Sequence, residues 1–320
     1  MFDVIVSKRT QESERIISLE LTAPNGGELP EFSAGAHIDV VTPNGPVRQY
    51  SLCNSPAERH RYCIAVQLEA DSRGGSTAIH QAAVEGSTLQ INAPRNLFPL
   101  DSSAQHSLLV AGGIGVTPIR SMAASLHGEG KSFELHYCGR QLANMAYLND
   151  LQQSEYGDQV HIHCDESESA QRLDITTLLQ QTDPTTHIYV CGPAGFMDYI
   201  LDGAAQAGWS AQQLHREYFS ASSPSDDDEQ GNRAFDLLLS SSNQVIRVAA
   251  DTSAAEALLA AGIDVPLSCE QGICGSCLTT VLEGTPEHRD SFLTPDEQAA
   301  NNCFTPCCSR AHSRQLTIDL

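Results

Sequence analysis

Short runs of alternating hydrophobic and polar residues dominate the N-terminal third of the chain. The segments HIDVV, VRQYSLC, RYCIAVQLE and STLQINAPR show the two-residue period of half-buried strands. The turn residues Pro43-Asn44-Gly45-Pro46 separate the first two segments and are typical of a hairpin. Many short strands without intervening helices predict a small antiparallel β-barrel over residues 1–103.

From residue 104 to residue 222 the pattern changes to buried strands that alternate with helices. The runs SLLVAGG, SFELHYCGR, VHIHCD and THIYVCGP are apolar and strand-like. Between them lie helix-like stretches such as AYLNDLQQS and FMDYILDGAAQAG. This alternation predicts an α/β domain with a doubly wound parallel sheet.

A polar, acidic segment without apolar periodicity follows, SASSPSDDDEQGNR at residues 220–233. We interpret residues 223–233 as an interdomain linker. The remainder, residues 234–320, combines the strands FDLLLS, QVIRVAA and QLTIDL with a short helix, SAAEALLAAG, and a cysteine-rich loop. This mixture predicts a third, α+β domain.

Composition and charge narrow the classes of function. The formal net charge is −22, with 40 acidic against 18 basic residues, and phosphate repulsion then argues against nucleic acid as a partner. The excess acid suits docking to a basic protein, although a solvated surface explains most such charges equally well. No apolar run reaches the roughly 18 residues of a membrane span, and no signal peptide is visible. A reducing, cytoplasmic location without membrane attachment is therefore expected.

Three closely spaced cysteines carry the most specific chemistry. Cys269, Cys274 and Cys277 follow the spacing C-x4-C-x2-C, which together with a distant fourth cysteine is the plant-type [2Fe–2S] ligand pattern. Two irons need four thiolates that converge from two sides. A loop containing Gly272 and Gly275 can wrap one side and turn its N–H groups toward the sulfurs.

The fourth ligand has three candidates, Cys303, Cys307 and Cys308. Zinc is the chemical alternative, but zinc sites usually pair two C-x2-C-like knuckles, and adjacent cysteines on an extended segment cannot both point inward. Cys303 is interpreted as incidental. Four further cysteines are interpreted as small buried apolar residues: Cys53, Cys63, Cys138 and Cys164.

Two glycine-containing turns suggest a nucleotide site. The first, VAGGIGVTP, spans Val110–Pro118 and would bring backbone N–H groups and a helix N-terminus to a pyrophosphate. The second, VCGPAGFM, follows a later strand. Both turns are expected at the carboxyl edge of the parallel sheet, where such sheets bind ligands.

The combination of RQYSL, GGIGVTP, CGP and the trailing cysteine motif resembles the ferredoxin–NADP reductase superfamily over essentially the whole chain. The domain order is similar to the branch that contains phthalate dioxygenase reductase and vanillate O-demethylase reductase. This resemblance implies a flavin-binding β-barrel, a nicotinamide-binding α/β domain and a β-grasp ferredoxin domain. In plant-type ferredoxins 29 residues separate the third ligand from the fourth, which assigns Cys307 as the fourth ligand.

The resemblance also implies flavin-contacting residues. Arg48 would bind the flavin phosphate, Tyr50 would pack on the isoalloxazine ring, and Ser51 would hydrogen-bond near flavin N5. The turn at Gly74, Gly75 and Ser76 would complete the phosphate site. An arginine, a flat aromatic ring and a hydroxyl suit a phosphorylated planar cofactor. Alternatively, Arg48 and Tyr50 are ordinary residues on a strand surface.

For the nicotinamide nucleotide, the resemblance implies contacts from both turns. Cys191 would lie near the nicotinamide ring, and Phe219, in the segment HREYF, would shield the flavin face; as an alternative, Phe219 is a core residue that caps the domain. The other implied contact residues are Gly112, Gly113, Gly115, Thr117, Pro118, Gly192 and Pro193.

The implied function is that of an electron-transfer reductase. NADH delivers two electrons at once, a [2Fe–2S] cluster accepts one, and a flavin bridges the difference. The resemblance favours FMN, with FAD as the alternative, and no catalytic acid or base is assigned. The acceptor would be the terminal component of a Rieske-type oxygenase in aromatic or quaternary-amine catabolism. Two alternatives are a redox sensor, which would not turn over NADH, and a self-contained oxygenase, which would need an additional metal site.

Overall fold

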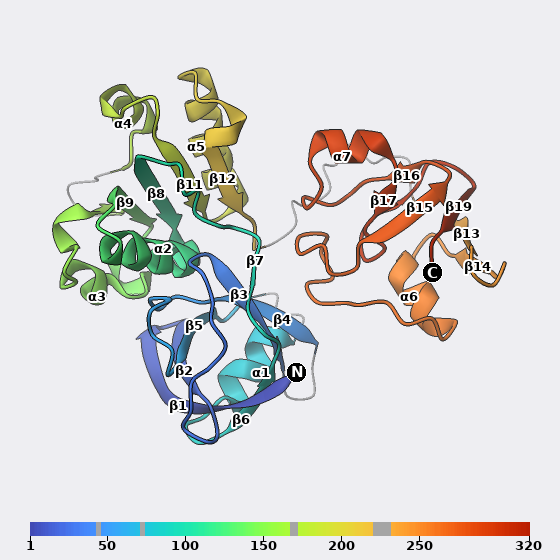
Figure 1. The fold of residues 1–320 in the computed structure, drawn as a ribbon, viewed down its shortest axis with the longest axis horizontal. Coiled ribbons are helices and arrows are strands. Elements are labelled where there is room, and N and C mark those ends of the chain that lie inside the picture. Colours follow the sequence, from blue (N-terminus) through green and yellow to red (C-terminus); the bar gives the residue numbers. More distant parts are fainter. Residues whose placement is uncertain (43–45, 71–73, 167–171, 220–231) are drawn as a thin grey trace. The chain divides into compact units, whose positions relative to one another are not determined.

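The computed structural model describes residues 1–42, 46–70, 74–166, 172–219 and 232–320 (Figure 1). The chain divides into two compact units, Met1–Phe219 and Ser220–Leu320. Each unit has its own hydrophobic core, and the N-terminal unit contains two different sheets.

The first sheet of the N-terminal unit is antiparallel, with the strand order β4-β3-β6-β1-β2-β5 and with β7 added against β3. The two ends of this order, β4 and β5, approach each other, so the sheet curls into the expected barrel around a core of aliphatic side chains. Its strands are β1 (Phe2–Ser13), β2 (Ile16–Thr22), β3 (Ala36–Val41), β4 (Val47–Ser51), β5 (Tyr62–Gln67), β6 (Thr88–Ile91) and β7 (Arg95–Asn96).

Strands β3 and β4 pair antiparallel, with Ile38 opposite Tyr50, as the predicted hairpin requires. Its turn at residues 43–45 lies outside the described residues. The expectation of a barrel without helices is wrong, because α1 (Gly75–Ala82) follows β5. Gly74 precedes this helix with φ of 96°, a conformation that favours glycine, and Ile79 packs into the barrel core. Ile79 is the one large buried side chain among these eight residues, and one residue cannot produce the helical period that would reveal the helix in the sequence.

The second sheet of the N-terminal unit is parallel, in the order β10-β9-β8-β11-β12, which confirms the doubly wound prediction. Helices α2 and α3 accompany the face of the sheet that carries Leu109 and Leu135, whereas α4 and α5 cover the face with Leu108 and Val110. The strands are β8 (His106–Gly112), β9 (Ser132–Gly139), β10 (Val160–Cys164), β11 (His187–Cys191) and β12 (Leu214–Glu217). The helices are α2 (Val116–Gly128), α3 (Leu148–Gln152), α4 (Ile175–Gln181) and α5 (Ala194–Gln206).

The C-terminal unit is a mixed sheet in the order β14-β13-β19-β15-β17, with β13 and β19 parallel and the other neighbours antiparallel. Helix α6 packs on this sheet through Leu258. A second, two-stranded sheet pairs β16 with β18. The elements are β13 (Phe235–Leu239), β14 (Val245–Val248), α6 (Ala254–Ala260), β15 (Thr279–Glu283), β16 (Pro286–Glu287), α7 (Pro295–Ala300), β17 (Cys303–Phe304), β18 (Arg310–Ala311) and β19 (Gln315–Ile318).

Helix α7 was not anticipated, although its N-terminus has a readable capping box. The Thr294 hydroxyl accepts the N–H of Glu297, and the Glu297 carboxylate accepts the N–H of Thr294 at 2.8 Å. Most of the predicted linker, residues 223–231, lies outside the described residues, and the domain limits at 103, 222 and 234 stay predictions. Within the described ranges, no helix is both long and apolar enough to cross a membrane.

Candidate cofactor sites

In the C-terminal unit, the predicted ligand cysteines come together in two pairs. The thiols of Cys269 and Cys274 are hydrogen-bonded to each other, and the thiol of Cys307 is hydrogen-bonded to those of Cys277 and Cys308. The Cys269 hydrogen bond lowers the pKa of Cys274 to about 5. Two pairs of thiols match the need of a two-iron cluster, in which each iron binds two cysteines besides the bridging sulfides.

Backbone donors surround the first pair. The N–H groups of Gln271 and Ile273 lie 3.3 and 3.5 Å from Sγ of Cys269, and the Ser276 N–H lies 3.4 Å from Sγ of Cys274. These donors stabilise negative charge on sulfur, as a thiolate ligand requires. The donor set therefore fits an iron–sulfur cluster.

The loop holds its shape because glycines occupy positions that no side chain can enter. Gly275 has a φ of 64°, and a Cβ there would lie 2.3 Å from the ring of Phe292. Gly272 has a φ of 71°, and its Cβ would lie 2.4 Å from Sγ of Cys308. The Cys308 sulfur lies 3.3 Å from the Thr305 hydroxyl and is also hydrogen-bonded to Cys307, whereas Cys307 in addition meets Cys277.

In the barrel, the predicted phosphate residues lie together although they come from distant positions in the sequence. A Cβ on Gly75 would lie 2.7 Å from Cγ and 3.0 Å from Nε of Arg48, so the arginine side chain runs directly across the N-terminus of α1. The Ser76 hydroxyl, in the first turn of this helix, accepts the Glu69 N–H at 3.2 Å. An arginine at a helix N-terminus fits a phosphate group.

Tyr50 and Ser51 end strand β4 beside this site. Tyr50 is partly buried against the barrel core, and this burial raises its pKa to about 12. The Ser51 hydroxyl is buried and donates to Oε2 of Glu217 at 3.3 Å. Desolvation raises the pKa of the Glu217 carboxyl to about 8, although part of the residue remains accessible.

Sequence analysis missed Glu217. It lies in the segment HREYF, from which only Phe219 was selected, and its register partner across β11 and β12 is Cys191. Cys191 is fully buried, and burial together with Glu217 raises the pKa of its thiol well above the usual value. Glu217 directly follows Arg216 in the polar strand LHRE, so the sequence offered no local signal that this carboxyl is desolvated.

The two glycine turns meet at the carboxyl edge of the parallel sheet. Strands β9 and β10 are added on one side of β8, and β11 and β12 on the other, so the order of strand addition reverses between β8 and β11 although the two strands are parallel. Such a switch point is where open α/β sheets bind ligands. The turns after both strands therefore lie where a nucleotide is expected.

These glycines serve packing as well as ligand approach. A Cβ on Gly115 would lie 2.2 Å from the carbonyl oxygen of Cys191, and one on Gly192 would lie 3.0 Å from Cα of Gly112. Gly113 differs, because its φ is 56° and the space around its Cβ position is open. Gly113 is therefore the position in this group that leaves room for a ligand.

Three other predicted residues have distinct environments. The Thr117 hydroxyl donates to the carbonyl of Ile114 at 3.0 Å, and this hydrogen bond stabilises the start of α2. Pro118 is buried in the first turn of α2, and Pro193 immediately precedes α5. Phe219 is 40% exposed, so it is not the core residue that the alternative interpretation required.

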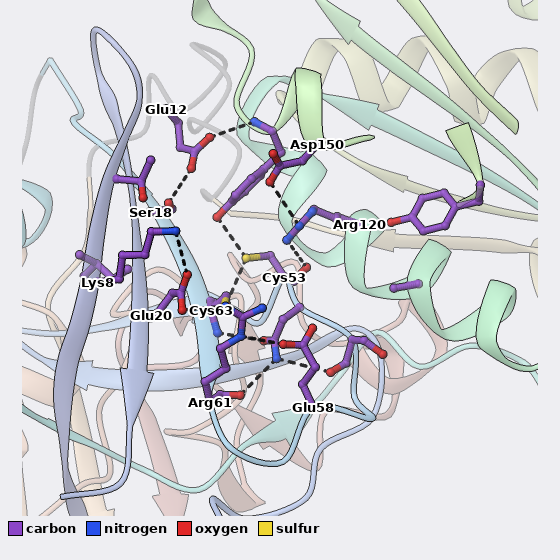
Figure 2. Close-up of a pocket in the computed structure, with 17 residues that line it drawn as sticks. Lys8, Glu12, Ser18, Glu20, Cys53, Glu58, Arg61, Cys63, Arg120 and Asp150 are labelled. Carbon is purple, nitrogen blue, oxygen red and sulfur yellow. Dashed lines mark hydrogen bonds and ion pairs between the residues drawn. The ribbon is translucent and has the colours of Figure 1, made fainter. Parts of the chain in front are cut away.

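A pocket of about 490 Å³ lies elsewhere in the N-terminal unit, between strands β1, β2 and β5 and helices α2 and α3 (Figure 2). Its charges are paired: Glu20 lies 3.4 Å from Lys8 and 2.6 Å from Arg61, and Arg120 lies 3.6 Å from Asp150. The side chains that line it are different from the predicted cofactor residues. Mutual neutralisation makes this pocket a poor site for a phosphorylated cofactor.

Two histidine pairs cross neighbouring strands of the parallel sheet. Nδ1 of His187 lies 3.0 Å from Nε2 of His215, with Asp101 nearby, and Nδ1 of His136 lies 2.9 Å from Nε2 of His163. The rings of the two pairs are inclined by 17° and 18°. Nearly parallel rings with nitrogens at these distances fit a hydrogen bond between the two imidazoles of each pair. Each pair contributes to a group whose potential ligand atoms lie within 4.8 Å of one another and could hold a metal ion: Asp101, His187 and His215 in one, and Glu134, His136 and His161 in the other.

Comparisons with known proteins agree with these features. Residues 238–312 match the family model of a 2Fe-2S iron-sulfur cluster binding domain, and residues 91–214 match that of the N-terminal domain of the DmmA-like dimethylamine monooxygenase subunit. A vanillate O-demethylase oxidoreductase from a Pseudomonas species is 48% identical over 320 residues, covering 100% of both chains.

Another relative is the phthalate dioxygenase reductase of Burkholderia cepacia, 39% identical over 98% of this chain and 96% of that protein. A solved phthalate dioxygenase reductase, described as a modular structure for electron transfer from pyridine nucleotides to [2Fe–2S], superposes with a TM-score of 0.78 and 38% identity. It covers 100% of this chain and 98% of its own.

Proposed function

The chain belongs to the phthalate dioxygenase reductase and vanillate O-demethylase oxidoreductase family, and from this premise we propose how its own residues carry out the family's electron transfer. It is an oxidoreductase, the reductase component of an oxygenase system that passes electrons from NADH through a flavin to a [2Fe–2S] cluster. The flavin supplies the conversion between two-electron and one-electron transfer, and the cluster supplies the one-electron outlet. The protein binds these groups, orients them and excludes water.

One observation carries the proposal most directly, the two hydrogen-bonded thiol pairs of the C-terminal unit. We assign Cys269 and Cys274 to one iron and Cys277 and Cys307 to the other, because these are the sulfurs that lie together. Cys308 is not assigned as a ligand, because its thiol is hydrogen-bonded to Cys307, Thr305 and Ser309, whereas Cys307 is hydrogen-bonded to Cys277.

The barrel supports FMN as the flavin. Arg48 and the N-terminus of α1 form one compact phosphate site, which suits a cofactor that ends in a single phosphate. Tyr50 would pack on the flavin ring, and the Ser51 hydroxyl would be oriented toward it by Glu217. With a carboxyl pKa of about 8, Glu217 carries its proton at neutral pH and holds no unpaired charge beside the bound nicotinamide.

The parallel sheet supports NADH rather than NADPH. A 2′-phosphate requires unpaired basic groups, and the Arg172 guanidinium lies 3.7 Å from the Asp165 carboxylate. Arg140 immediately follows β9 as a single basic residue in HYCGR, without the cluster of arginine and lysine that would favour a 2′-phosphate. We place the nicotinamide between the glycine turns, close to Cys191 and with Phe219 next to the flavin.

The proposed acceptor is a separate oxygenase component of the Rieske type, acting on an aromatic substrate of the vanillate kind. Purified protein should reduce cytochrome c with NADH, and mass spectrometry of the released flavin should identify FMN. Cytochrome c reduction with bound FAD would correct the cofactor assignment. An absence of NADH turnover in protein that retains flavin and cluster would contradict the reductase function and favour a redox sensor.

A further inference from the structure

The carboxyl group of Asp290 is completely buried in the C-terminal unit, with a side-chain exposure of 0%. A buried carboxylate is costly unless both oxygens are hydrogen-bonded. Oδ2 of Asp290 accepts the Leu293 N–H at 2.8 Å, and Oδ1 accepts the Ser309 hydroxyl at 3.3 Å. Nδ1 of His288 lies 3.5 Å from Oδ1. The carboxylate therefore has a built environment of donors, and one donor is close to the proposed iron ligands.

Ser309 connects Asp290 to the segment that carries the fourth proposed ligand. Its hydroxyl oxygen lies 2.9 Å from that of Thr305, which in turn lies 3.3 Å from Sγ of Cys308. The carboxylate can only accept, so the chain runs from the Cys308 thiol to Thr305, to Ser309 and to Asp290. The Arg289 N–H also donates to the Ser309 hydroxyl, at 3.1 Å. This chain orders the turn that flanks Cys307.

The backbone of Asp290 meets the other ligand-bearing segment. A Cβ on Gly272, between Cys269 and Cys274, would lie 2.9 Å from Cα of Asp290. The next residue, Ser291, donates its N–H to the Gly272 carbonyl at 3.0 Å. Asp290 therefore contacts the three-cysteine loop through its backbone and the Cys307 segment through its side chain.

We propose that Asp290 is a positioning residue for the [2Fe–2S] cluster, joining its two ligand-bearing segments and placing a buried, hydrogen-bonded carboxylate beside them. The inference rests on the proposed ligand set. A neighbouring hydrogen-bond network orients metal ligands, and its loss typically weakens metal retention by roughly 10- to 100-fold. A negative charge near the cluster also opposes the arrival of an electron, so its removal should raise the reduction potential.

The test uses the full-length protein carrying its flavin and cluster. Three variants probe the network: Asp290→Asn keeps the shape without the charge, Asp290→Ala removes the side chain, and Ser309→Ala cuts the link to Thr305. The matched control is Asp296→Asn, which neutralises an exposed acid on α7 of the same unit. The readouts are the cluster's midpoint potential, followed by electron paramagnetic resonance, and the rate of iron loss to a chelator.

We expect Asp290→Asn to shift the midpoint potential upward, and Asp290→Ala to lose iron roughly 10- to 100-fold faster than wild type. Ser309→Ala should lose iron faster while keeping a potential close to that of wild type. The control should match wild type in both readouts. If Asp290→Ala does not fold, Asp290→Asn and Ser309→Ala decide the question.

Potentials and iron-loss rates in Asp290→Asn and Ser309→Ala that equal those of the control would overturn the proposal. NADH-dependent flavin bleaching is recorded in the same samples. Wild-type protein that bleaches its flavin but contains no iron and sulfide, and shows no [2Fe–2S] resonance after chemical reduction, would instead contradict the cluster assignment, which separates the two failures.

Discussion

The hydroxyl of Ser51 lies 3.3 Å from Oε2 of Glu217, although 166 positions separate the two residues in the sequence. Ser51 ends the barrel strand β4, and Glu217 ends β12 of the parallel sheet. Their contact joins the two sheets of the N-terminal unit at the place where the proposed flavin and nicotinamide sites meet. The Glu217 carboxyl group that accepts this hydrogen bond has a pKa of about 8, raised by burial.

Glu217 should make the stability of the protein depend on pH. Its pKa is higher in the folded protein, about 8, than the ordinary value of 4.5 expected after unfolding. The unfolded chain therefore loses this proton first, and the folded state becomes relatively less stable as pH rises from about 4.5 to about 8. Glu217→Gln removes this effect. Its unfolding temperature should exceed that of wild type by roughly a few degrees more at pH 8.5 than at pH 5.5.

The measurement is thermal unfolding of the complete protein across this pH range, with flavin release as the signal. Glu14→Gln, which neutralises an exposed acid between β1 and β2 of the same unit, is the matched control and should follow wild type. A pH-independent difference between Glu217→Gln and wild type would show that the carboxyl is ionised in the folded protein.

The two adjacent cysteines should respond differently to substitution. Cys307→Ser removes the sulfur that is paired with Cys277 and should abolish or severely destabilise the cluster, whereas Cys308→Ser should retain it. Because cluster binding is coupled to folding, Cys307→Ser should also make the C-terminal unit more sensitive to protease. Iron and sulfide content, with the visible spectrum, report the outcome. The reverse behaviour would assign Cys308 as the fourth ligand.

Arg48 should matter for flavin binding far more than for folding. Arg48→Ala deletes the charged partner beside α1 and should weaken flavin binding by roughly 10- to 100-fold, as expected for a hydrogen bond to a charged group. Arg15→Ala is the control, because Arg15 is an exposed arginine of the same barrel that donates to the Leu68 carbonyl. Fluorescence titration of flavin into the apoprotein gives both dissociation constants. Equal affinities would place the phosphate elsewhere.

Sequence patterns can reveal features that depend on residues close together in the sequence, but they miss contacts between residues that only the fold brings together. The cysteine spacing and the two glycine turns are local patterns, so they identified the cluster loop and the carboxyl-edge turns without a structure. Helix α1 has one buried apolar anchor and gave no readable period. Glu217 and Asp290 gain their importance from partners that only the fold brings near, Ser51 for the first and Ser309 for the second. No local pattern could reveal these two acids.

Electron delivery to the oxygenase should depend on salt. Residues 234–320 contain eleven acidic and four arginine side chains, a net charge of −7 before the cluster is counted. Attraction to a basic acceptor would raise the association rate, and ions would screen it. Transfer should slow as ionic strength rises from about 0.01 to 0.5 M, over which the Debye length falls from roughly 30 Å to a few Å.

Flavin reduction by NADH is the internal control for this experiment, since it takes place within the reductase once the nucleotide is bound. Stopped-flow absorbance across a salt series measures both steps. A salt-independent second step would mean that the acidic residues only keep the protein hydrated, and it would leave the reductase function intact.

The most direct test of the central claim is anaerobic mixing of the loaded protein with NADH, followed by rapid freezing and electron paramagnetic resonance. The account predicts that the flavin absorbance bleaches first and that the resonance of a reduced [2Fe–2S] cluster then appears. The Cys307→Ser variant should show the bleaching without the resonance. Flavin bleaching in wild-type protein with a cluster that stays oxidised would contradict the proposed route from NADH to the iron–sulfur centre.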